Sequence, residues 1–239
     1  MTIYVWGFFV ALGIMLSLAV STRFAKTRGL DHTLLWNTAA WGIGAVLIGA
    51  RLFHVLFYDF FTYFSDPLAI IRLWDGGMSM FGGIAGGAIV IAYILKRRGV
   101  SIIQYSDAYV FGLPLGIFIG RIGCFLIHDH PGTLTNFFLG IKYQDGVIRH
   151  DLGLYESLFG LLLFALFLLI GLRLRIKPGI FTALFLVLYG LFRVLLDYLR
   201  ILDVTYLGLT PAQYFGYSII ILGGLMFWQI LNKKASKSN

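Results

Sequence analysis

Three arginines lie inside apolar segments of this 239-residue sequence: Arg51, Arg121 and Arg193. An arginine at the centre of a bilayer costs about 2.5 kcal/mol or more to insert, so such residues are rare and tend to face an interior cavity. A guanidinium group binds phosphate oxygens through two parallel hydrogen bonds. The three residues therefore predict an anion site, and a phospholipid headgroup is the phosphate available inside a membrane.

A group of titratable residues follows the second arginine. The stretch GRIGCFLIHDHPG (120–132) ends in His128, Asp129 and His130, and His150 lies in the same polar segment. Histidine and carboxylate side chains serve as general bases. Two other interpretations stay open. The segment could be a polar helix end with solvated histidines. The three histidines could also bind a metal, but residues two apart do not share a helix face and no further ligand is evident.

The elements that must position these residues are apolar helices. The chain is 59% hydrophobic and 13% charged, whereas soluble domains are about one quarter charged. About 20 apolar residues cross the hydrocarbon core of a bilayer. We therefore expect an all-α integral membrane protein with one domain, 1–239, and seven spans: 3–23, 33–58, 78–95, 104–127, 153–172, 179–200 and 211–231.

The distribution of lysine and arginine predicts the orientation. Twelve of the nineteen basic residues lie in the connections after spans 1, 3 and 5 and in the tail, which are all on one side of a seven-span protein. The positive-inside rule makes that side the cytoplasm, so the N-terminus faces out and the C-terminus faces in. The loops 59–77 and 128–152 are then outside, with a short interfacial helix expected in the first and a hairpin in the second. The net charge of +8 is accounted for by topology and anionic lipid, not by nucleic acid.

The three arginines share one depth in these spans. Each lies about seven residues from the outer end of span 2, 4 or 6, which at 1.5 Å per residue is about 10 Å below the surface. Each could simply pair with an internal acid, because Asp197 is one turn from Arg193 and Glu156 opens span 5. Two acids leave an excess of positive charge for three arginines. Arg200 and Arg72 lie nearer the interface, where snorkelling is the ordinary explanation.

Several stretches resemble the prolipoprotein diacylglyceryl transferase family. They occur in the family's order and, with the spans, cover nearly the whole chain: GARLFHVLFYDF (49–60), DPLAIIRLWDGGMSMFGGIAGG (66–87), SDAYVFGLPLG (106–116), GRIG (120–123), RHDLGLYE (149–156), YGLFRVLLDYLR (189–200) and LTPAQ (209–213). The resemblance implies a multi-pass enzyme of the bacterial cytoplasmic membrane. It implies transfer of the diacylglyceryl group of phosphatidylglycerol to the lipobox cysteine thiol of a prolipoprotein, which forms a thioether and releases glycerol phosphate. The partners would be membrane lipids and the prolipoprotein signal segment, with no metal and no cofactor.

The resemblance also implies a set of site residues. The family's arginines in GRIG, YG-x-FR and GAR match Arg121, Arg193 and Arg51. We expect Arg121 and Arg193 to hold the phosphate, with Arg51 and Arg200 assisting. Glu156 is expected to orient Arg121 or Arg193, besides its place at a helix start. The other expected substrate-binding residues lie in the same motifs: Gly76, Gly77, Ser79, Gly82, Gly83, Gly120, Tyr155 and Glu156.

The sequence departs from the family where a base would be. The fullest signature reads GGMSFHGG, but here Phe81 replaces the histidine, and GRIGNFINGE becomes GRIGCFLIHD, with Asp129 at the glutamate position. A thiol must lose its proton to become a good nucleophile. We expect the lost histidine's work to fall to this cluster, with His128 or His150 as base and Asp129 beside them. His128 would share a face with Arg121 if the helix continued to it.

Other functions stay open at this point. A phospholipid-binding or lipid-transport protein could have kept the anion site and lost catalysis with Phe81, and an anion channel is a further possibility. Cys124 could act as its own nucleophile with His128, although a lone intramembrane cysteine is usually inert. The glycines of 76–87 could serve helix packing alone, and His54 is expected to pack within the bundle.

Overall fold

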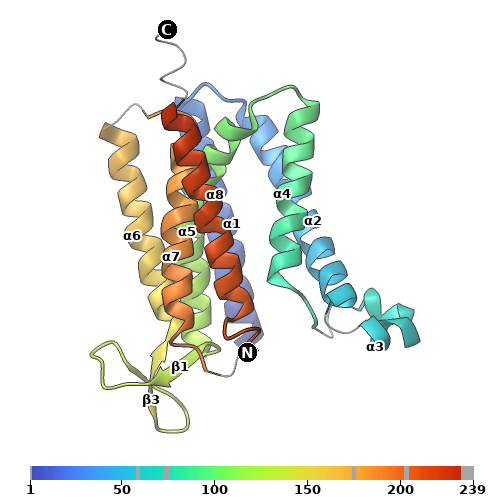
Figure 1. Cartoon of the computed structure of the whole chain (residues 1–239), viewed down its shortest axis with the longest axis vertical. Coiled ribbons are helices and arrows are strands. Elements are labelled where there is room, and N and C mark those ends of the chain that lie inside the picture. The colour runs from blue at the N-terminus through green and yellow to red at the C-terminus, as the bar shows by residue number, and fades with distance from the viewer. Residues whose placement is uncertain (1, 58–59, 73–75, 174–175, 202–204, 233–239) are drawn as a thin grey trace. The chain divides into compact units, whose positions relative to one another are not determined.

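The structure is a computed structural model that describes residues 2–57, 60–72, 76–173, 176–201 and 205–232 (Figure 1). Its helices are α1 (Thr2–Thr27), α2 (His32–Phe57), α3 (Phe60–Ser65), the 3-10 helix η1 (Pro67–Ile70), α4 (Met80–Arg97), α5 (Ile102–Ile127), α6 (Leu152–Arg173), α7 (Ile180–Asp197) and α8 (Pro211–Asn232). Three short strands lie between α5 and α6: β1 (Pro131–Leu134), β2 (Ile141–Lys142) and β3 (Ile148–Asp151).

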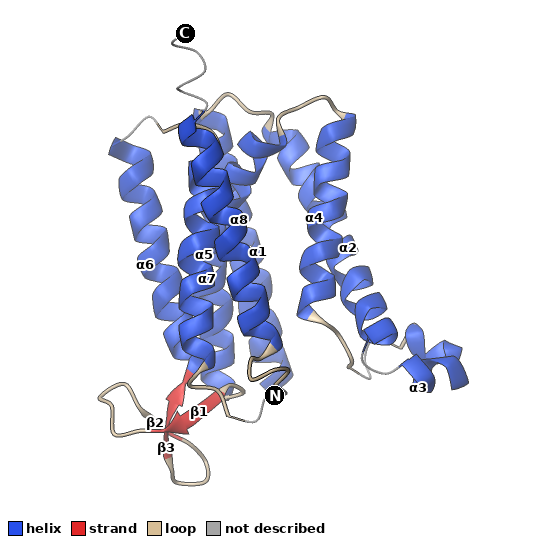
Figure 2. Ribbon diagram, viewed as in Figure 1, coloured by secondary structure: helices blue, strands red, loops and turns tan. Residues whose placement is uncertain are grey.

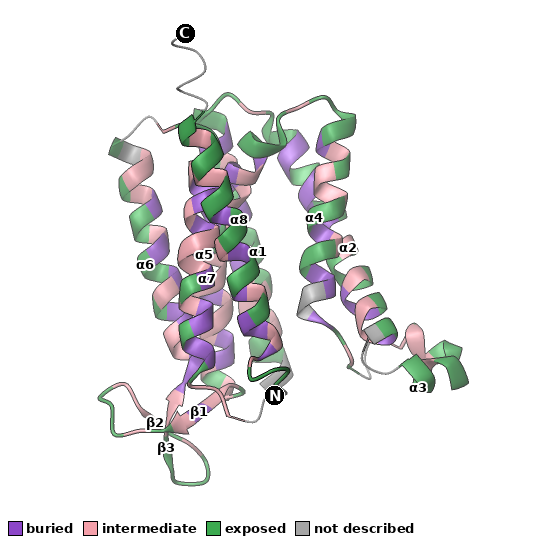
Figure 3. Cartoon of the chain, in the orientation of Figure 1, coloured by how far each residue is buried: buried purple, intermediate pink, exposed green. Residues whose placement is uncertain are grey.

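Six of the described helices are long and apolar enough to cross a membrane: α1, α2, α5, α6, α7 and α8. Many residues of these helices are exposed (Figure 3), and the exposed side chains include the large apolar groups of Trp41, Leu162 and Trp228. Such side chains suit contact with lipid, and the expectation of a helical, multi-pass membrane protein is confirmed. The helix α4, on the expected third span, has 18 residues and is not among the six. A seventh span therefore stays a prediction.

The chain divides into two compact units, which are described one at a time. The first holds residues 1–27 and 106–239, and the second holds residues 28–105. The first unit is a bundle of α1, α5, α6, α7 and α8, with the sheet at the end where α1 and α8 begin (Figure 2). The second unit contains α2, α3, η1 and α4.

Small residues let the helices of each unit approach closely. A Cβ on Gly13 of α1 would lie 2.8 Å from the carbonyl oxygen of Gly116 in α5. A Cβ on Gly86 of α4 would lie 2.6 Å from the carbonyl oxygen of Ala45 in α2. Both distances are too short for a methyl group, so these glycines permit the backbone contact that membrane helices use in place of large apolar interfaces.

Both expected loops contain short elements, but their location outside the membrane stays a prediction. Residues 60–70 form α3 and η1, which have no buried residues. The second loop forms an antiparallel sheet in the order β1-β3-β2, rather than a simple hairpin. The amide of Thr133 donates to the carbonyl of Leu199 at 2.8 Å, which ties β1 to the chain just after α7.

Candidate active site

One buried carboxylate of the first unit, that of Glu156, lies between Arg121 and Arg193. Glu156, near the start of α6, lies with Oε2 3.0 Å from Nη2 of Arg121 on α5 and 3.9 Å from Nη1 of Arg193 on α7. Tyr189 donates its hydroxyl to Oε1 at 2.7 Å. Three helices thus meet at one side chain, and the depth match expected from the sequence corresponds to real proximity for Arg121 and Arg193.

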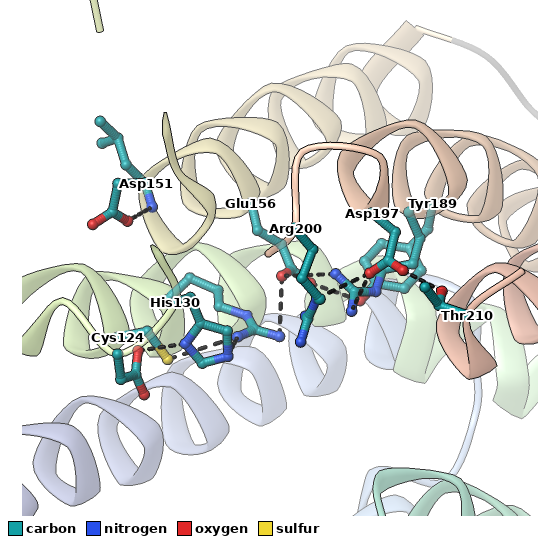
Figure 4. A network of polar contacts seen from close by, with 12 residues as sticks. Cys124, His130, Asp151, Glu156, Tyr189, Asp197, Arg200 and Thr210 are labelled. Carbon is teal, nitrogen blue, oxygen red and sulfur yellow. Dashed lines mark hydrogen bonds and ion pairs between the residues drawn. The ribbon is translucent and has the colours of Figure 1, made fainter. Parts of the chain in front are cut away.

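A second buried carboxylate continues the network toward the end of α7 (Figure 4). Asp197 Oδ1 lies 3.5 Å from Nη2 of Arg193 and 3.1 Å from Nε of Arg200. Its other oxygen accepts a hydrogen bond from the hydroxyl of Thr210. Thr210 and Gln213 bond to each other's backbone amides at 3.0 and 3.1 Å, a reciprocal cap at the start of α8. The LTPAQ motif therefore holds Asp197 in place.

The charges of these five groups do not cancel. Arg121, Arg193 and Arg200 carry three positive charges, whereas Glu156 and Asp197 carry two negative charges. Arg193 and both acids are buried, but the side chains of Arg121 and Arg200 keep 22% and 25% of their surface exposed. The simple alternative of one acid for each arginine is therefore only partly met, because two acids face three arginines and Arg193 is shared between them.

Arg121 also reaches beyond the end of its helix. Its Nη1 lies 3.3 Å from Nε2 of His130 and 3.7 Å from Sγ of Cys124. Nδ1 of His130 is hydrogen-bonded to the carboxylate of Asp129. The structure thus brings Asp129 to Arg121 through His130, which no sequence pattern distinguishes from the neighbouring histidines.

The two histidines that we expected to act as base have other partners. The helix α5 ends at Ile127, and His128 has a left-handed backbone with φ 51°. The expectation that His128 continues the helix face of Arg121 is therefore wrong. Nδ1 of His128 lies 3.1 Å from Oδ2 of Asp151, and Nδ1 of His150 lies 2.7 Å from the hydroxyl of Tyr155. The first contact ties the turn after α5 to β3, the second ties β3 to α6, and neither involves an arginine.

Asp151 organises this end of the bundle. It is buried, accepts a hydrogen bond from the Tyr143 hydroxyl at 2.9 Å, and caps α6 by accepting from the amide of Leu154 at 2.9 Å. Burial, and then the hydrogen bond to Asp151, raise the pKa of Tyr143 well above its usual range. A cavity of about 370 Å³ lies beside this group, lined by residues that include His128, Tyr143 and Arg149.

A metal ion fits this region poorly. Cys124, Asp129 and His130 offer ligand atoms within 4.8 Å of one another. The guanidinium of Arg121 contacts both the sulfur and Nε2 of the histidine. A divalent cation would have to displace a permanent positive charge that Glu156 also holds, so these residues suit a proton acceptor better than a metal.

In the second unit, Arg51 is buried among main-chain carbonyls. Nε donates to Ile70 at 3.0 Å, and the two Nη atoms donate to four further carbonyls, those of Ala69, Arg72, Gly76 and Gly77. All five N–H groups are used. Arg51 therefore holds residues 69–72 and 76–77 in place, and its expected contact with substrate remains a prediction.

The glycines of the second unit divide into two groups. Gly76 and Gly77 have φ values of 81° and 73°, and a Cβ on Gly77 would lie 2.8 Å from Nη1 of Arg51. Only glycine suits that turn. Gly82 and Gly83 face α2, where a Cβ on Gly83 would lie 3.2 Å from Cγ1 of Val46 and one on Gly82 would overlap Gly49. These two positions match the packing alternative.

Two expected substrate-binding residues, Ser79 and Gly120, leave room for a further contact: one has a hydroxyl without a partner, and the other has open space beside its Cα. The buried hydroxyl of Ser79 has no hydrogen-bond partner among the described residues, although its amide donates to the carbonyl of Ala50 at 2.9 Å. Gly120 precedes Arg121 on α5, and a Cβ there would meet no atom within 4 Å. Gly120 thus leaves open space on the helix that carries Arg121.

The family model for prolipoprotein diacylglyceryl transferases matches residues 1–229 of this chain. The chain belongs to the prolipoprotein diacylglyceryl transferase family. Three similar proteins are each named phosphatidylglycerol–prolipoprotein diacylglyceryl transferase. The protein of Wolbachia sp. subsp. Drosophila simulans (strain wRi) is 34% identical over 87% of this chain and 81% of its own length. Those of Finegoldia magna and Teredinibacter turnerae are each 31% identical, over 96% and 95% of this chain and 91% and 82% of their own lengths.

Tyr189, Thr210 and Gln213 were missed from the sequence, and His130 was named there but not chosen as the base. Tyr189 lies one turn before Arg193 in the family's YG-x-FR motif, so its neighbourhood was visible although its role was not. The T-x-x-Q pattern of Thr210 and Gln213 is a recognisable helix cap. Nothing in the sequence distinguished His130 from His128, because the deciding feature is a change of backbone direction between them.

Proposed function

We propose that this protein transfers the diacylglyceryl group of phosphatidylglycerol to the lipobox cysteine thiol of prolipoproteins. The reaction forms a thioether and releases glycerol phosphate. Membership of the family and the names of the similar proteins support this reaction. The observation that carries it is the network of Arg121, Arg193 and Arg200 around two acids, which keeps a surplus of positive charge where α5, α6 and α7 meet.

The arginines would act on the phosphate. Negative charge grows on the leaving phosphate as the bond between the glyceryl carbon and the phosphate oxygen breaks, and fixed positive groups stabilise that charge. We assign the direct contacts to Arg121 and Arg193, with Arg200 assisting. Glu156 and Asp197 keep the guanidinium groups aligned before lipid arrives, so little reorganisation is needed during the reaction.

The expected contributions of the second unit are narrower. Arg51, Gly76 and Gly77 would shape the 66–77 segment, since the arginine's N–H groups bond to that segment's carbonyls. Ser79 is its best candidate for a direct hydrogen bond to substrate, because its buried hydroxyl has no partner among the described residues. Gly82 and Gly83 would serve mainly by letting α4 approach α2.

We place the protein in the bacterial cytoplasmic membrane with the sheet outside. We expect α4 to span the membrane in addition to the six long apolar helices, which makes seven spans. In the first unit, α1 and α6 end at the face opposite the sheet (Figure 1). Lys26 and Arg173 lie in their last turns, and Lys177 follows and bonds to the carbonyl of Ile230 in α8. This arrangement supports the positive-inside orientation, with the N-terminus outside.

The reaction is tested by incubating purified protein with phosphatidylglycerol labelled in its diacylglyceryl part and a lipobox peptide. We expect wild type to give a labelled peptide whose bond survives hydroxylamine, since a thioether resists cleavage and a thioester does not. Arg121→Ala and Arg193→Ala should each lower the rate at least about 100-fold, the scale of losing a transition-state donor. Arg97→Ala, at the exposed end of α4, is the control.

Two outcomes would contradict the proposal. Binding of phosphatidylglycerol without transfer by wild type would favour a lipid-binding or lipid-transport protein instead. Label on the protein itself, lost on replacing Cys124 by alanine, would indicate a self-acylating mechanism.

A further inference from the structure

We propose that His130 is the general base of this protein and that Asp129 is its positioning residue. This inference rests on the proposed transferase function and names the group that takes the proton of the incoming thiol. It differs from the sequence-based expectation, which assigned that role to His128 or His150.

The partners of His130 define which of its ring nitrogens carries the proton. Nε2 lies 3.3 Å from Nη1 of Arg121, and arginine has only donors. Nε2 must therefore carry the lone pair in this contact. The ring proton is then on Nδ1, where it donates to the carboxylate of Asp129. An acid that fixes one histidine tautomer and leaves the other nitrogen as acceptor is the arrangement of a catalytic base.

The surroundings also suit a base for an incoming substrate. The side chains of His130 and Asp129 keep 27% and 34% of their surface exposed, so a peptide thiol can approach. The carbonyl of His130 accepts from the amide of Leu152 at 3.1 Å, which anchors the residue to the start of α6. The charged and titratable groups facing it are Arg121 and Cys124 of α5 and the adjacent Asp129, with Glu156 of α6 behind the arginine.

His128 shares the contact of Nδ1 with an acid, but neither His128 nor His150 has its other ring nitrogen hydrogen-bonded to Arg121. The Nδ1 atom of His128 is engaged by the buried Asp151, and that of His150 by the hydroxyl of Tyr155. Neither is hydrogen-bonded to an arginine of the network. His130 is thus the histidine whose acceptor nitrogen lies beside the proposed phosphate-binding group.

The reaction step follows from this geometry. Phosphate oxygens compete with Nε2 for the N–H of Arg121, so lipid binding frees the lone pair of His130. The substrate thiol gives its proton to Nε2, and the sulfur electron pair forms the bond to the glyceryl carbon. The bond from that carbon to the phosphate oxygen breaks, and its electron pair stays on the phosphate. The imidazolium, stabilised by Asp129, then returns its proton to water.

The decisive variant is His130→Gln, because an amide oxygen can still accept from Arg121 but cannot take up the proton. With a cysteine peptide at pH 7, we expect a loss of about 100- to 10,000-fold, the usual worth of a general base. The residual rate should rise about tenfold per pH unit toward the thiol pKa of about 8.5, since only the thiolate then reacts. The wild-type rate should rise less steeply over the same range.

A selenocysteine peptide separates proton removal from folding and binding. A selenol is already ionised at neutral pH and needs no base. His130→Gln should therefore transfer lipid to it within a few-fold of wild type. Asp129→Asn should show a smaller version of the same pattern, a loss with cysteine and recovery with selenocysteine. His32→Gln, at the exposed start of α2, is the matched control and should behave as wild type with both peptides.

Several results would overturn this assignment. One is full activity of His130→Gln with the cysteine peptide at pH 7. A second is an equal loss with both peptides at every pH, which would mean a structural or binding role. A third is the steep pH profile with selenocysteine recovery in His128→Gln or His150→Gln instead. In each case wild type still transfers lipid, so the proposed function survives; if wild type transfers nothing, both proposals fail together.

Discussion

Glu156 and Arg121 form an ion pair, 3.0 Å between Oε2 and Nη2, within a network that also includes Arg193. The carboxylate is almost completely buried, whereas the arginine side chain keeps 22% of its surface exposed. A buried acid thus holds one Nη atom of a partly exposed guanidinium, whose other Nη atom contacts His130 and Cys124. This asymmetry would let Arg121 bind a phosphate without leaving its partner, and it sets the first prediction.

Glu156→Gln should lower lipid transfer about 10- to 100-fold while leaving the protein folded. The amide keeps the side chain's shape and can still accept from Tyr189, but the charge that aligns Arg121 and Arg193 is lost. Transfer rates should be measured beside Asp145→Asn, which alters an exposed acid paired with Arg149 and should have no effect. An unchanged rate in Glu156→Gln would mean that the arginines need no buried counter-charge.

Gly120→Leu should block lipid access with little effect on stability. A side chain at Gly120 meets no atom within 4 Å, so leucine would extend into the open space next to Arg121. Gly224 on α8 is equally open, and Gly224→Leu is the matched control. We expect at least a tenfold rise in KM for phosphatidylglycerol in the first variant alone. Equal kinetics in both variants would show that the space beside Gly120 is not used by substrate.

Sequence and structure agree best for features that depend on residues close together in the chain, such as helices and short motifs. Apolar length predicts the helices, and the GRIG and YG-x-FR motifs lead to Arg121 and Arg193, which do converge. Arg51 shows where such reasoning stops: the sequence predicts the same depth for it, yet its N–H groups bond to carbonyls of a loop whose path no helix pattern specifies. The choice among the histidines meets a similar limit, because the contacts of His128, His130 and His150 depend on a turn. Non-glycine residues with positive φ are uncommon, so the turn at His128 could not be expected.

Asp151→Asn should destabilise the junction of the sheet with α6. The carboxylate accepts from Tyr143, His128 and the amide of Leu154, and an asparagine has one oxygen fewer for these donors. Leaving a buried donor without its partner costs about 1–3 kcal/mol. Thermal unfolding in detergent should show the loss, and Asp145→Asn again serves as the exposed control. No change in Tm would mean that water replaces the carboxylate at this position.

Tyr143 predicts an alkaline limit to stability. Burial and Asp151 raise the pKa of Tyr143 in the folded protein, so the folded state favours the protonated hydroxyl. Its contribution is complete below the unfolded pKa of about 10 and is lost as pH rises toward the folded value. The Tm of wild type should therefore fall more steeply above pH 10 than that of Tyr143→Phe. Parallel curves for the two proteins would contradict this coupling.

Arg51→Ala should loosen residues 66–72 and 76–77 rather than abolish phosphate binding directly. The substitution removes five hydrogen bonds to main-chain carbonyls, together with the contact of the guanidinium with the Tyr63 ring, 4.9 Å from its centroid. Hydrogen exchange of residues 66–72 and 76–79 should speed up markedly, while the amides of α6 and α7 stay protected. Arg51→Lys keeps the charge but has only three donors. Its exchange rates should therefore lie between those of wild type and Arg51→Ala. If both variants kept wild-type exchange and yet lost phosphatidylglycerol binding, Arg51 would instead be a direct ligand of the lipid phosphate.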